Sequence, residues 1–201
     1  MDNHLLAFLA LGDSYTIGES VDEKDRWPNQ LVHLLNKANL QYSQPTIIAK
    51  TGWTTDELEL AISASELNEK YDLVSLLIGV NNQYRDLSII DYQIEFERLL
   101  KKAIELAGGF TNRVIVISIP DWGVTPFAEE RNRNKIANEI DNFNRINYKI
   151  SEKHKVHYVE ITQHSRKAAK DLSLIADDKL HPSAKMYQHW AEEVYLKILE
   201  K

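Results

Sequence analysis

Five short apolar runs alternate along this chain with segments of helical periodicity, and this alternation constrains the fold more than any other feature. The runs are residues 5–11, 46–49, 73–78, 114–119 and 156–161. Their apolar positions are nearly continuous, which is typical of strands buried on both faces of a parallel sheet. The helical patterns fall at residues 27–38, 54–67, 89–107, 134–153 and 184–199. The sequence therefore predicts one three-layer α/β/α domain over residues 1–201, built on a five-stranded parallel sheet.

Local signals support two of the helix ends. Thr54 is followed three residues later by Glu57, which is the signature of a capping box. The pair Gly108 and Gly109 provides a natural end for the third helix. Residues 79–88 and 120–133 are expected to be long, irregular loops, and long loops in compact domains are often functional. Right-handed crossovers place the loops that follow the strands on one edge of the sheet.

Charge and composition exclude several classes of function. The net charge of −6 argues against nucleic acid as a partner, because nonspecific binding needs a basic face. The chain has no cysteine, which excludes a thiol nucleophile, a disulfide and a cysteine-ligated zinc site. The histidine spacings match no zinc motif, so no metal is expected. Residues 1–4 lack the positive stretch of a secretory signal and residues 5–11 are too short to span a membrane, so we expect a cytoplasmic protein without an integral membrane segment.

The first apolar run ends at Gly12-Asp13-Ser14. Ser14 is therefore expected just past the end of a buried strand, at the edge where α/β sheets bind ligands. A serine needs an adjacent base to act as a nucleophile. His181 is the candidate base, and Asp178, three residues earlier, is the candidate partner of its ring. Asp13 is expected to hold the turn. Taken alone, Ser14 could instead cap a helix and His181 could be a surface residue.

Two further residues are candidates for an oxyanion hole, the set of donors that stabilises the negative oxygen formed during acyl transfer. Gly52 follows the second run and offers a backbone N–H that a ligand can approach closely. Asn81 follows the third run and offers a side-chain amide. Each also has a structural interpretation, Gly52 as a turn glycine and Asn81 as a turn or cap residue. Because three successive strands end in Ser14, Gly52 and Asn81, the functional interpretation is favoured.

Aromatic residues near these positions could line a pocket for an acyl chain or a sugar, although aromatic side chains more often belong to the core. The candidates for binding substrate are Tyr15, Trp53 and Trp122, with Tyr84 and Phe127 nearby. The depth of the pocket around Trp53, Trp122 and Phe127 is expected to decide which acyl groups fit.

The four motifs together resemble those of the GDSL/SGNH hydrolases, in order and in position, from near residue 5 to near residue 190. They are Gly12-Asp13-Ser14, Gly52, Gly79-x-Asn81 and Asp178-x-x-His181. The resemblance implies the SGNH hydrolase fold, a flavodoxin-like sheet of strand order 2-1-3-4-5. It implies Ser14 as nucleophile, His181 as base, Asp178 as its partner, and an oxyanion hole of the Ser14 N–H, the Gly52 N–H and the Asn81 side chain. It also implies hydrolysis of carboxylic esters or thioesters with no metal or organic cofactor.

Two positions depart from the family pattern. Asn82 stands where the third motif commonly has an aspartate, which affects the support of the oxyanion hole rather than its donor. Gly52 lacks the asparagine often found shortly before it.

The sequence thus predicts a serine ester hydrolase that acts on a small-molecule ester with a short to medium acyl chain, in the manner of a lysophospholipase or esterase. A carbohydrate acetylesterase or a thioesterase using the same site is an alternative. A hydrolase-like domain that only binds esters or glycans is another. An alternative of a different class is a flavodoxin-like phosphate- or nucleotide-binding module, in which Ser14, Thr16 and Gly18 would cradle a phosphate. The sequence does not predict an oligomeric state.

Overall fold

The computed structural model describes residues 5–68 and 70–200, so the two ends of the predicted domain, residues 1–4 and 201, lie outside the described residues. The strands form one sheet in the order β2-β1-β3-β4-β5, and neighbouring strands are parallel. Their bounds are β1 (Phe8–Gly12), β2 (Thr46–Ala49), β3 (Leu73–Leu77), β4 (Val114–Ile117) and β5 (His157–Val159). The predicted flavodoxin-like topology is therefore confirmed.

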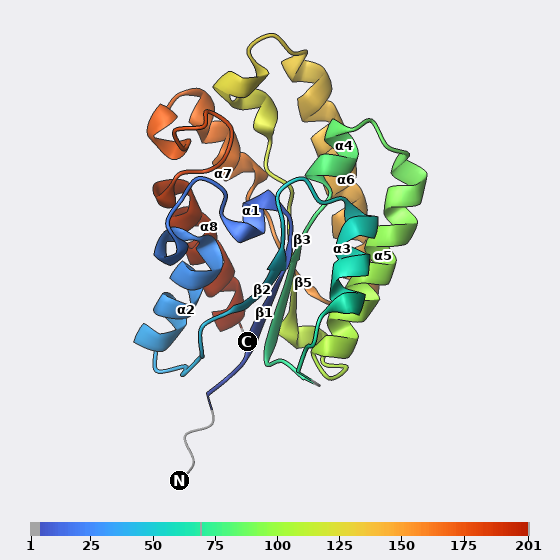
Figure 1. Cartoon of the computed structure of the whole chain (residues 1–201), viewed down its shortest axis with the longest axis vertical. Coiled ribbons are helices and arrows are strands. Elements are labelled where there is room, and N and C mark those ends of the chain that lie inside the picture. Colours follow the sequence, from blue (N-terminus) through green and yellow to red (C-terminus); the bar gives the residue numbers. More distant parts are fainter. Residues whose placement is uncertain (1–4, 69, 201) are drawn as a thin grey trace.

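Helices cover both faces of the sheet, as predicted (Figure 1). On one face α2 (Trp27–Lys37) packs against α8 (Ala184–Leu199). On the other face α5 (Ile89–Leu106) packs against α3 (Thr55–Ala64) and α6 (Arg133–His154). Among residues 5–68 and 70–200, no helix has both the length and the apolar character that crossing a membrane requires.

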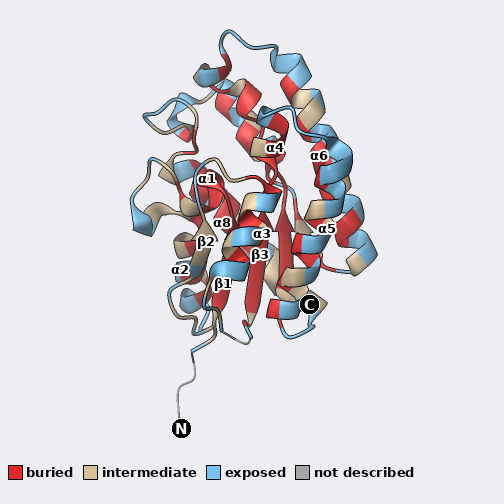
Figure 2. Cartoon of the chain, turned by 45° about the vertical axis from the view of Figure 1, so that its right-hand side comes forward, coloured by how far each residue is buried: buried red, intermediate tan, exposed pale blue. Residues whose placement is uncertain are grey.

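The inner strands form the centre of the core (β1 and β3 in Figure 2), and the edge strands do not. Every residue of β1, β3 and β4 is buried, as the apolar runs predict. In contrast, β2 contains no buried residue and β5 only one. The prediction of burial on both faces is wrong for these two strands, because each lies at an edge of the sheet and is covered by fewer neighbours.

The predicted ends of two helices can be compared with the structure. The capping box at α3 is confirmed, since Thr54 N–H donates to Glu57 at 2.9 Å. This helix ends at Ala64 rather than at residue 67. Ser65 is already extended, and its hydroxyl donates to the Ala61 carbonyl at 2.7 Å, a local bond that competes with helix propagation. At the end of α5, Gly108 and Gly109 adopt positive φ angles, as expected for a helix stop.

Several short helices that the sequence analysis does not predict follow the strands. They are α1 (Ser14–Ile17), α4 (Val80–Tyr84) and α7 (Thr162–Arg166). Single 3₁₀ turns occupy Glu23–Asp25, Thr111–Arg113, Trp122–Val124, Pro126–Ala128, Lys167–Ala169 and Leu172–Leu174. Residues 79–88 and 120–133 are therefore partly helical, not irregular. Elements of three to five residues are too short to show a helical period. Those that directly follow a strand, such as α1, shape the edge of the sheet that carries Ser14.

Candidate active site

A cavity of about 180 Å³ lies where β1 and β3 end, and it brings together side chains from distant parts of the chain. Among its lining residues are the candidates Ser14, Tyr15, Gly52, Asn81, Trp122 and His181. A larger groove of about 540 Å³ lies over α2, but it contains none of the candidate residues. The smaller cavity is therefore the candidate active site.

Ser14 is positioned by the sharp turn from β1 into α1. Asp13 caps this helix, since its Oδ1 accepts a hydrogen bond of 3.0 Å from Tyr15 N–H. Gly12 allows the turn, because a Cβ at this position would collide with Thr16 Oγ1 and lie 2.5 Å from the Leu77 carbonyl. The expectation that Asp13 holds the turn is confirmed. Ser14 itself is 4% exposed and borders the cavity.

Asp13 is an unusual carboxyl group, because it is fully buried and its Oδ2 has no hydrogen-bond partner among the described residues. Burial raises the pKa of Asp13 from 3.8 to about 7, and the bond from Tyr15 N–H offsets this only in part. A carboxyl group with this pKa carries a proton for a large fraction of the time near neutral pH.

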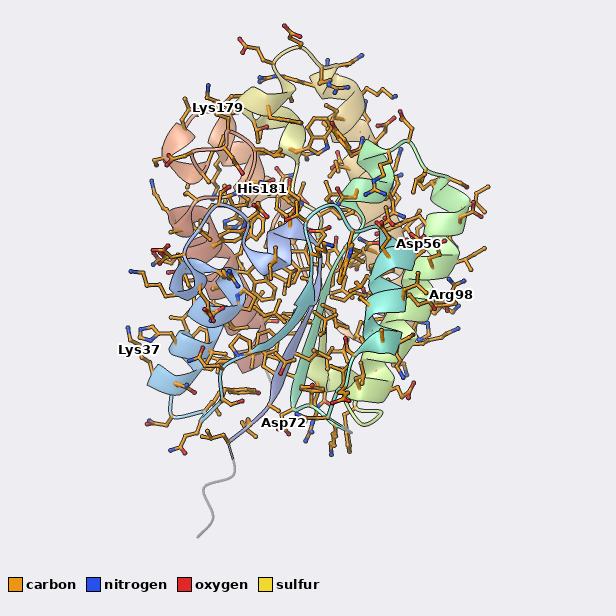
Figure 3. The ribbon with its side chains drawn as sticks, viewed as in Figure 1. Lys37, Asp56, Asp72, Arg98, Lys179 and His181 are labelled. Atoms are coloured by element: carbon orange, nitrogen blue, oxygen red, sulfur yellow. The ribbon has the colours of Figure 1, made fainter. Side chains whose placement is uncertain are left out.

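Asp178 and His181 form a pair within one loop. His181 Nδ1 lies 2.6 Å from Asp178 Oδ2, while Asp178 Oδ1 accepts hydrogen bonds of 2.9 Å from the backbone N–H groups of Leu180 and His181. The left-handed backbone of Lys179, at φ +66°, allows this tight loop. Figure 3 shows His181 close to α1, at the end of the sheet that carries Ser14.

The charge state of Asp178 fixes the tautomer of the imidazole. Partial burial would raise the pKa of Asp178, but hydrogen bonds from Ser20, from Leu180 and from both His181 donors outweigh it and lower this pKa to about 2. The carboxylate is therefore ionised at neutral pH and accepts the proton on His181 Nδ1. In the neutral ring this tautomer leaves Nε2 free to accept a proton.

Ser14 and His181 border the same cavity, but no hydrogen bond joins Ser14 Oγ to His181 Nε2 in the structure. Hydrogen bonds of this kind are often long or poorly aligned without substrate and tighten in the complex. The structure thus brings the three candidate triad residues to one place and links two of them directly.

Three hydrogen-bond donors belong to residues that line the cavity and are the candidates for an oxyanion hole. The backbone N–H groups of Ser14 and Gly52 have no acceptor among the described residues. One hydrogen of the Asn81 amide is donated to the Trp53 carbonyl at 2.9 Å, and an amide nitrogen carries two, so the second is available. These donors are the three that the sequence analysis names.

The position of Gly52 is determined by a tight turn over residues 50–53. Trp53 N–H donates to the Lys50 carbonyl at 3.2 Å, and Gly52 adopts φ +89° while Thr51 does not have a positive φ. This combination defines a type II turn with glycine at its third position. The turn follows β2, and Gly52 lines the cavity.

Asn82, which stands where the family pattern commonly has aspartate, is 2% exposed and joins α4 to the start of α3. Its Oδ1 accepts from Thr55 N–H at 3.1 Å and its Nδ2 donates to Thr55 Oγ1 at 2.7 Å. The Thr55 hydroxyl in turn donates to Glu95. An aspartate could not donate to Thr55 and would add a second carboxylate beside Glu95. The amide therefore suits this chain better than the usual acid.

The aromatic candidates fall into two groups. Tyr15 and Trp122 line the cavity, and so do Tyr84 and Phe127. Trp53 does not line it, because its side chain packs against the core and only its carbonyl contacts the site, through Asn81. Trp53 therefore does not contribute to the depth of the cavity, contrary to the expectation from the sequence.

Tyr84, Trp122 and Phe127 form one wall, with ring centroids 5.3 to 6.4 Å apart. Trp122 is fixed by its Nε1, which donates to Gln83 Oε1 at 2.8 Å. Tyr84 and Phe127 are each 44% exposed. The wall therefore offers apolar surface to a bound molecule.

Sequence reasoning missed two polar residues that contact the site. Ser20 Oγ donates to Asp178 Oδ2 at 2.6 Å, and Arg85 Nη2 donates to the Gly52 carbonyl at 2.5 Å. Neither residue belongs to a motif or a periodic pattern. No signal in a single sequence could have found them.

The phosphate-binding alternative fits the structure poorly. Thr16, one of the residues that would cradle a phosphate, is fully buried and does not line the cavity. The α1 helix has only four residues, which leaves little of a helix dipole to bind an anion.

Comparison with known proteins adds independent findings. The chain matches the model of the GDSL-like lipase/acylhydrolase family over residues 10–189. No curated protein matches its sequence. The solved structure of TesA has a TM-score of 0.75 at 18% identity, covering 96% of this chain and 98% of TesA.

Two other solved structures are similar. The acetylxylan esterase Axe2 from Geobacillus stearothermophilus has a TM-score of 0.75 at 18% identity, covering 98% of this chain and 95% of Axe2. A lipase/acylhydrolase from Enterococcus faecalis has a TM-score of 0.71 at 19% identity, covering 96% and 95%. At these identities the likeness shows a shared fold.

Proposed function

This chain belongs to the GDSL-like lipase/acylhydrolase family, whose model covers most of its length, and from that premise we propose that it cleaves small carboxylic esters through a Ser14–His181–Asp178 triad. The observation that carries the proposal is one cavity bordered by Ser14, Gly52, Asn81 and His181, with His181 Nδ1 held 2.6 Å from Asp178.

In the first step Ser14 Oγ attacks the ester carbonyl carbon while His181 Nε2 takes the hydroxyl proton. Asp178 accepts the Nδ1–H and stabilises the imidazolium that forms. General-base action of this kind contributes about 10²–10⁴-fold to the rate. The low pKa of Asp178 supports this role, because the carboxylate stays charged over the whole neutral range.

The carbonyl oxygen becomes an oxyanion and is bound by the N–H groups of Ser14 and Gly52 and by the Asn81 amide. The intermediate then collapses: the bond to the alcohol oxygen breaks, and His181 returns the proton to that oxygen. Water, deprotonated by His181, attacks the acyl-enzyme and releases the carboxylic acid and Ser14. Ester and water give acid and alcohol, with no other reactant.

The size of the cavity favours a short acyl group. Its volume of about 180 Å³ is below the range of roughly 300–1,000 Å³ common for sites that bind drug-sized ligands. We propose that the acyl part is short to medium in length and that Tyr84 and Phe127 contact the rest of the substrate. An acetylated carbohydrate is the second candidate, because exposed aromatic rings suit a sugar face and a similar structure is that of an acetylxylan esterase.

The test is hydrolysis of p-nitrophenyl esters from acetate to palmitate by the wild type and by Ser14→Ala, with the fold of the variant checked by circular dichroism. We expect Ser14-dependent turnover that is highest for short chains. An acetylated xylo-oligosaccharide and an acetyl thioester assayed in parallel separate the two alternatives. Equal activity of both proteins would exclude Ser14 as nucleophile, and a maximum at palmitate would exclude the short-chain assignment.

A further inference from the structure

Arg85, the residue at the C-terminal end of α4, reaches across to the turn that carries Gly52. Its Nη2 donates to the Gly52 carbonyl at 2.5 Å, and its Nη1 lies 3.5 Å from Glu57 Oε2 on α3. The Arg85 guanidinium also lies 3.6 Å from the place that a Cβ of Gly52 would occupy. Arg85 belongs neither to the proposed triad nor to the proposed oxyanion hole. It nevertheless contacts the turn that supplies one of the oxyanion donors, the Gly52 N–H.

The turn and α4 are joined at two successive carbonyl groups. Asn81, near the start of α4, donates to the Trp53 carbonyl at 2.9 Å, and Arg85, at its end, donates to the Gly52 carbonyl. Asn81 and the Gly52 N–H are also two of the three proposed oxyanion donors. The contacts between α4 and the turn therefore set the distance between these two donors.

Glycine needs such support more than any other residue, because its backbone is the least restricted. Asn82 also joins α4 to Thr55, after the turn. Without Arg85, however, the Asn81 amide would make the one remaining hydrogen bond between α4 and the carbonyl groups of Gly52 and Trp53 among the described residues. One side chain would then have to tether the turn and bind the oxyanion. Oxyanion stabilisation depends on donors that are fixed before the charge develops, so a looser turn lowers the rate of the chemical step.

We propose that Arg85 is a positioning residue of the oxyanion hole, which holds the Gly52 carbonyl and thereby fixes the Gly52 N–H relative to Asn81. This inference rests on the proposed Ser14-dependent hydrolysis. Because Arg85 does not line the cavity, it acts through Gly52 and not on the substrate.

The test compares Arg85→Gln with a matched control, Arg98→Gln. Arg98 binds Glu59 at 2.7 Å and is 50% exposed, against 45% for Arg85, so both variants remove a half-exposed arginine that bridges to α3. Figure 3 shows Arg98 on the side of the molecule with α3 and α5, away from His181. The control therefore reports the effect of losing a surface ion pair alone.

For Arg85→Gln we expect kcat on p-nitrophenyl acetate to fall about 10-fold with KM changed less than about 2-fold, since complete loss of one donor costs about 10²–10³-fold. The affinity of a trifluoromethyl ketone, whose serine adduct carries an oxyanion, should fall by the same factor as kcat. Arg85→Lys should retain part of the rate, and millimolar guanidinium should restore part of it to Arg85→Ala.

The inference is overturned if Arg85→Gln keeps the kcat of Arg98→Gln, if the loss appears in KM alone, or if ketone affinity stays unchanged while kcat falls. Ser14→Ala is assayed beside these variants. Activity that does not depend on Ser14 contradicts the proposed function itself, whereas Ser14-dependent activity without an effect of Arg85 contradicts only the positioning role.

Discussion

Asp178 holds both the backbone and the ring of His181: one carboxylate oxygen accepts the His181 N–H at 2.9 Å, and the other lies 2.6 Å from Nδ1. The side chain that orients the imidazole thus also shapes the loop that carries it. Ser20 adds a bond of 2.6 Å to the oxygen that meets the ring. The carboxylate is held at both oxygens, so its rotation would break the contact with the ring as well as the contact with the backbone.

Asp178→Asn should lower kcat by about 10²–10⁴-fold, because an amide cannot stabilise the imidazolium and favours the wrong tautomer of the ring. Asp177→Asn is the matched control, since Asp177 is the exposed neighbouring acid and makes no hydrogen bond or ion pair with the described residues. Steady-state kinetics on p-nitrophenyl acetate measures both variants. A kcat for Asp178→Asn close to that of the control would remove Asp178 from the mechanism.

Asp13 should make the protein less stable as the pH rises through the range between about 4 and 7. The carboxyl group has a pKa of about 7 when folded and 3.8 as its ordinary value, so in this window the folded state binds more protons than the unfolded state. The free energy of unfolding then falls with increasing pH. Asp178, with a folded pKa of about 2, acts in the opposite direction and only below about pH 4.

Urea unfolding at pH 5 and pH 8 measures this effect. Asp13→Asn keeps the acceptor for Tyr15 N–H but carries no charge, so the variant should lose the dependence and gain stability at pH 8 relative to the wild type. If wild type and variant show the same difference between the two pH values, the buried carboxyl group does not titrate in this window.

Asn82→Asp should destabilise the fold by about 1–3 kcal/mol, because the new carboxylate cannot donate to Thr55 Oγ1 and lies near Glu95. The Thr55 hydroxyl has one hydrogen and cannot serve two carboxylates. In the double variant with Glu95→Gln, Thr55 can donate to the carboxylate introduced at position 82 and accept from the amide introduced at position 95, so most of the stability should return. Urea unfolding of the two single variants and the double variant gives the coupling, and additive effects would contradict this network.

The fold could be predicted from the sequence because its signals are local. Each strand is an apolar run, and each long helix has enough turns to show its period. The runs predicted the order of elements, and the edge strands β2 and β5 differ only in burial, which depends on their neighbours in the sheet. Helices of four or five residues, such as α1 and α4, have no period to detect.

Only the residues of the candidate site that belong to the sequence motifs could be predicted. Ser14 and Gly52 stand at strand ends, so the topology alone brings them together. The contact of Ser20 with Asp178 joins residues 158 positions apart, and that of Arg85 with Gly52 joins residues 33 positions apart. Such pairs depend on how loops pack, and no pattern along one chain encodes them.

Phe127→Ala should raise KM several-fold for p-nitrophenyl esters and leave kcat nearly unchanged, because Phe127 offers apolar surface at the cavity and has no group that could donate or accept a proton. Burying part of a phenyl ring against a substrate contributes about 1 kcal/mol or more at about 25 cal/mol per Å². Phe110→Ala is the control, since Phe110 is 49% exposed against 44% for Phe127 and does not line the cavity. A fall in kcat at constant KM would instead give Phe127 a role in the chemical step.

Asn81→Ala should lower kcat by about 10²–10³-fold while KM changes little, as expected when a donor acts on charge that develops only in the transition state. The variant also loses the bond of 2.9 Å to the Trp53 carbonyl, so part of the loss could come from movement of the turn that carries Gly52. Comparison with Arg85→Gln distinguishes the two causes. If Asn81 acts as a donor, Asn81→Ala should lose far more rate than the roughly 10-fold expected for Arg85→Gln, because complete loss of a donor costs about 10²–10³-fold. If Asn81 serves only as a tether, Asn81→Ala should lose about as much rate as Arg85→Gln, and a near-wild-type kcat would exclude both roles.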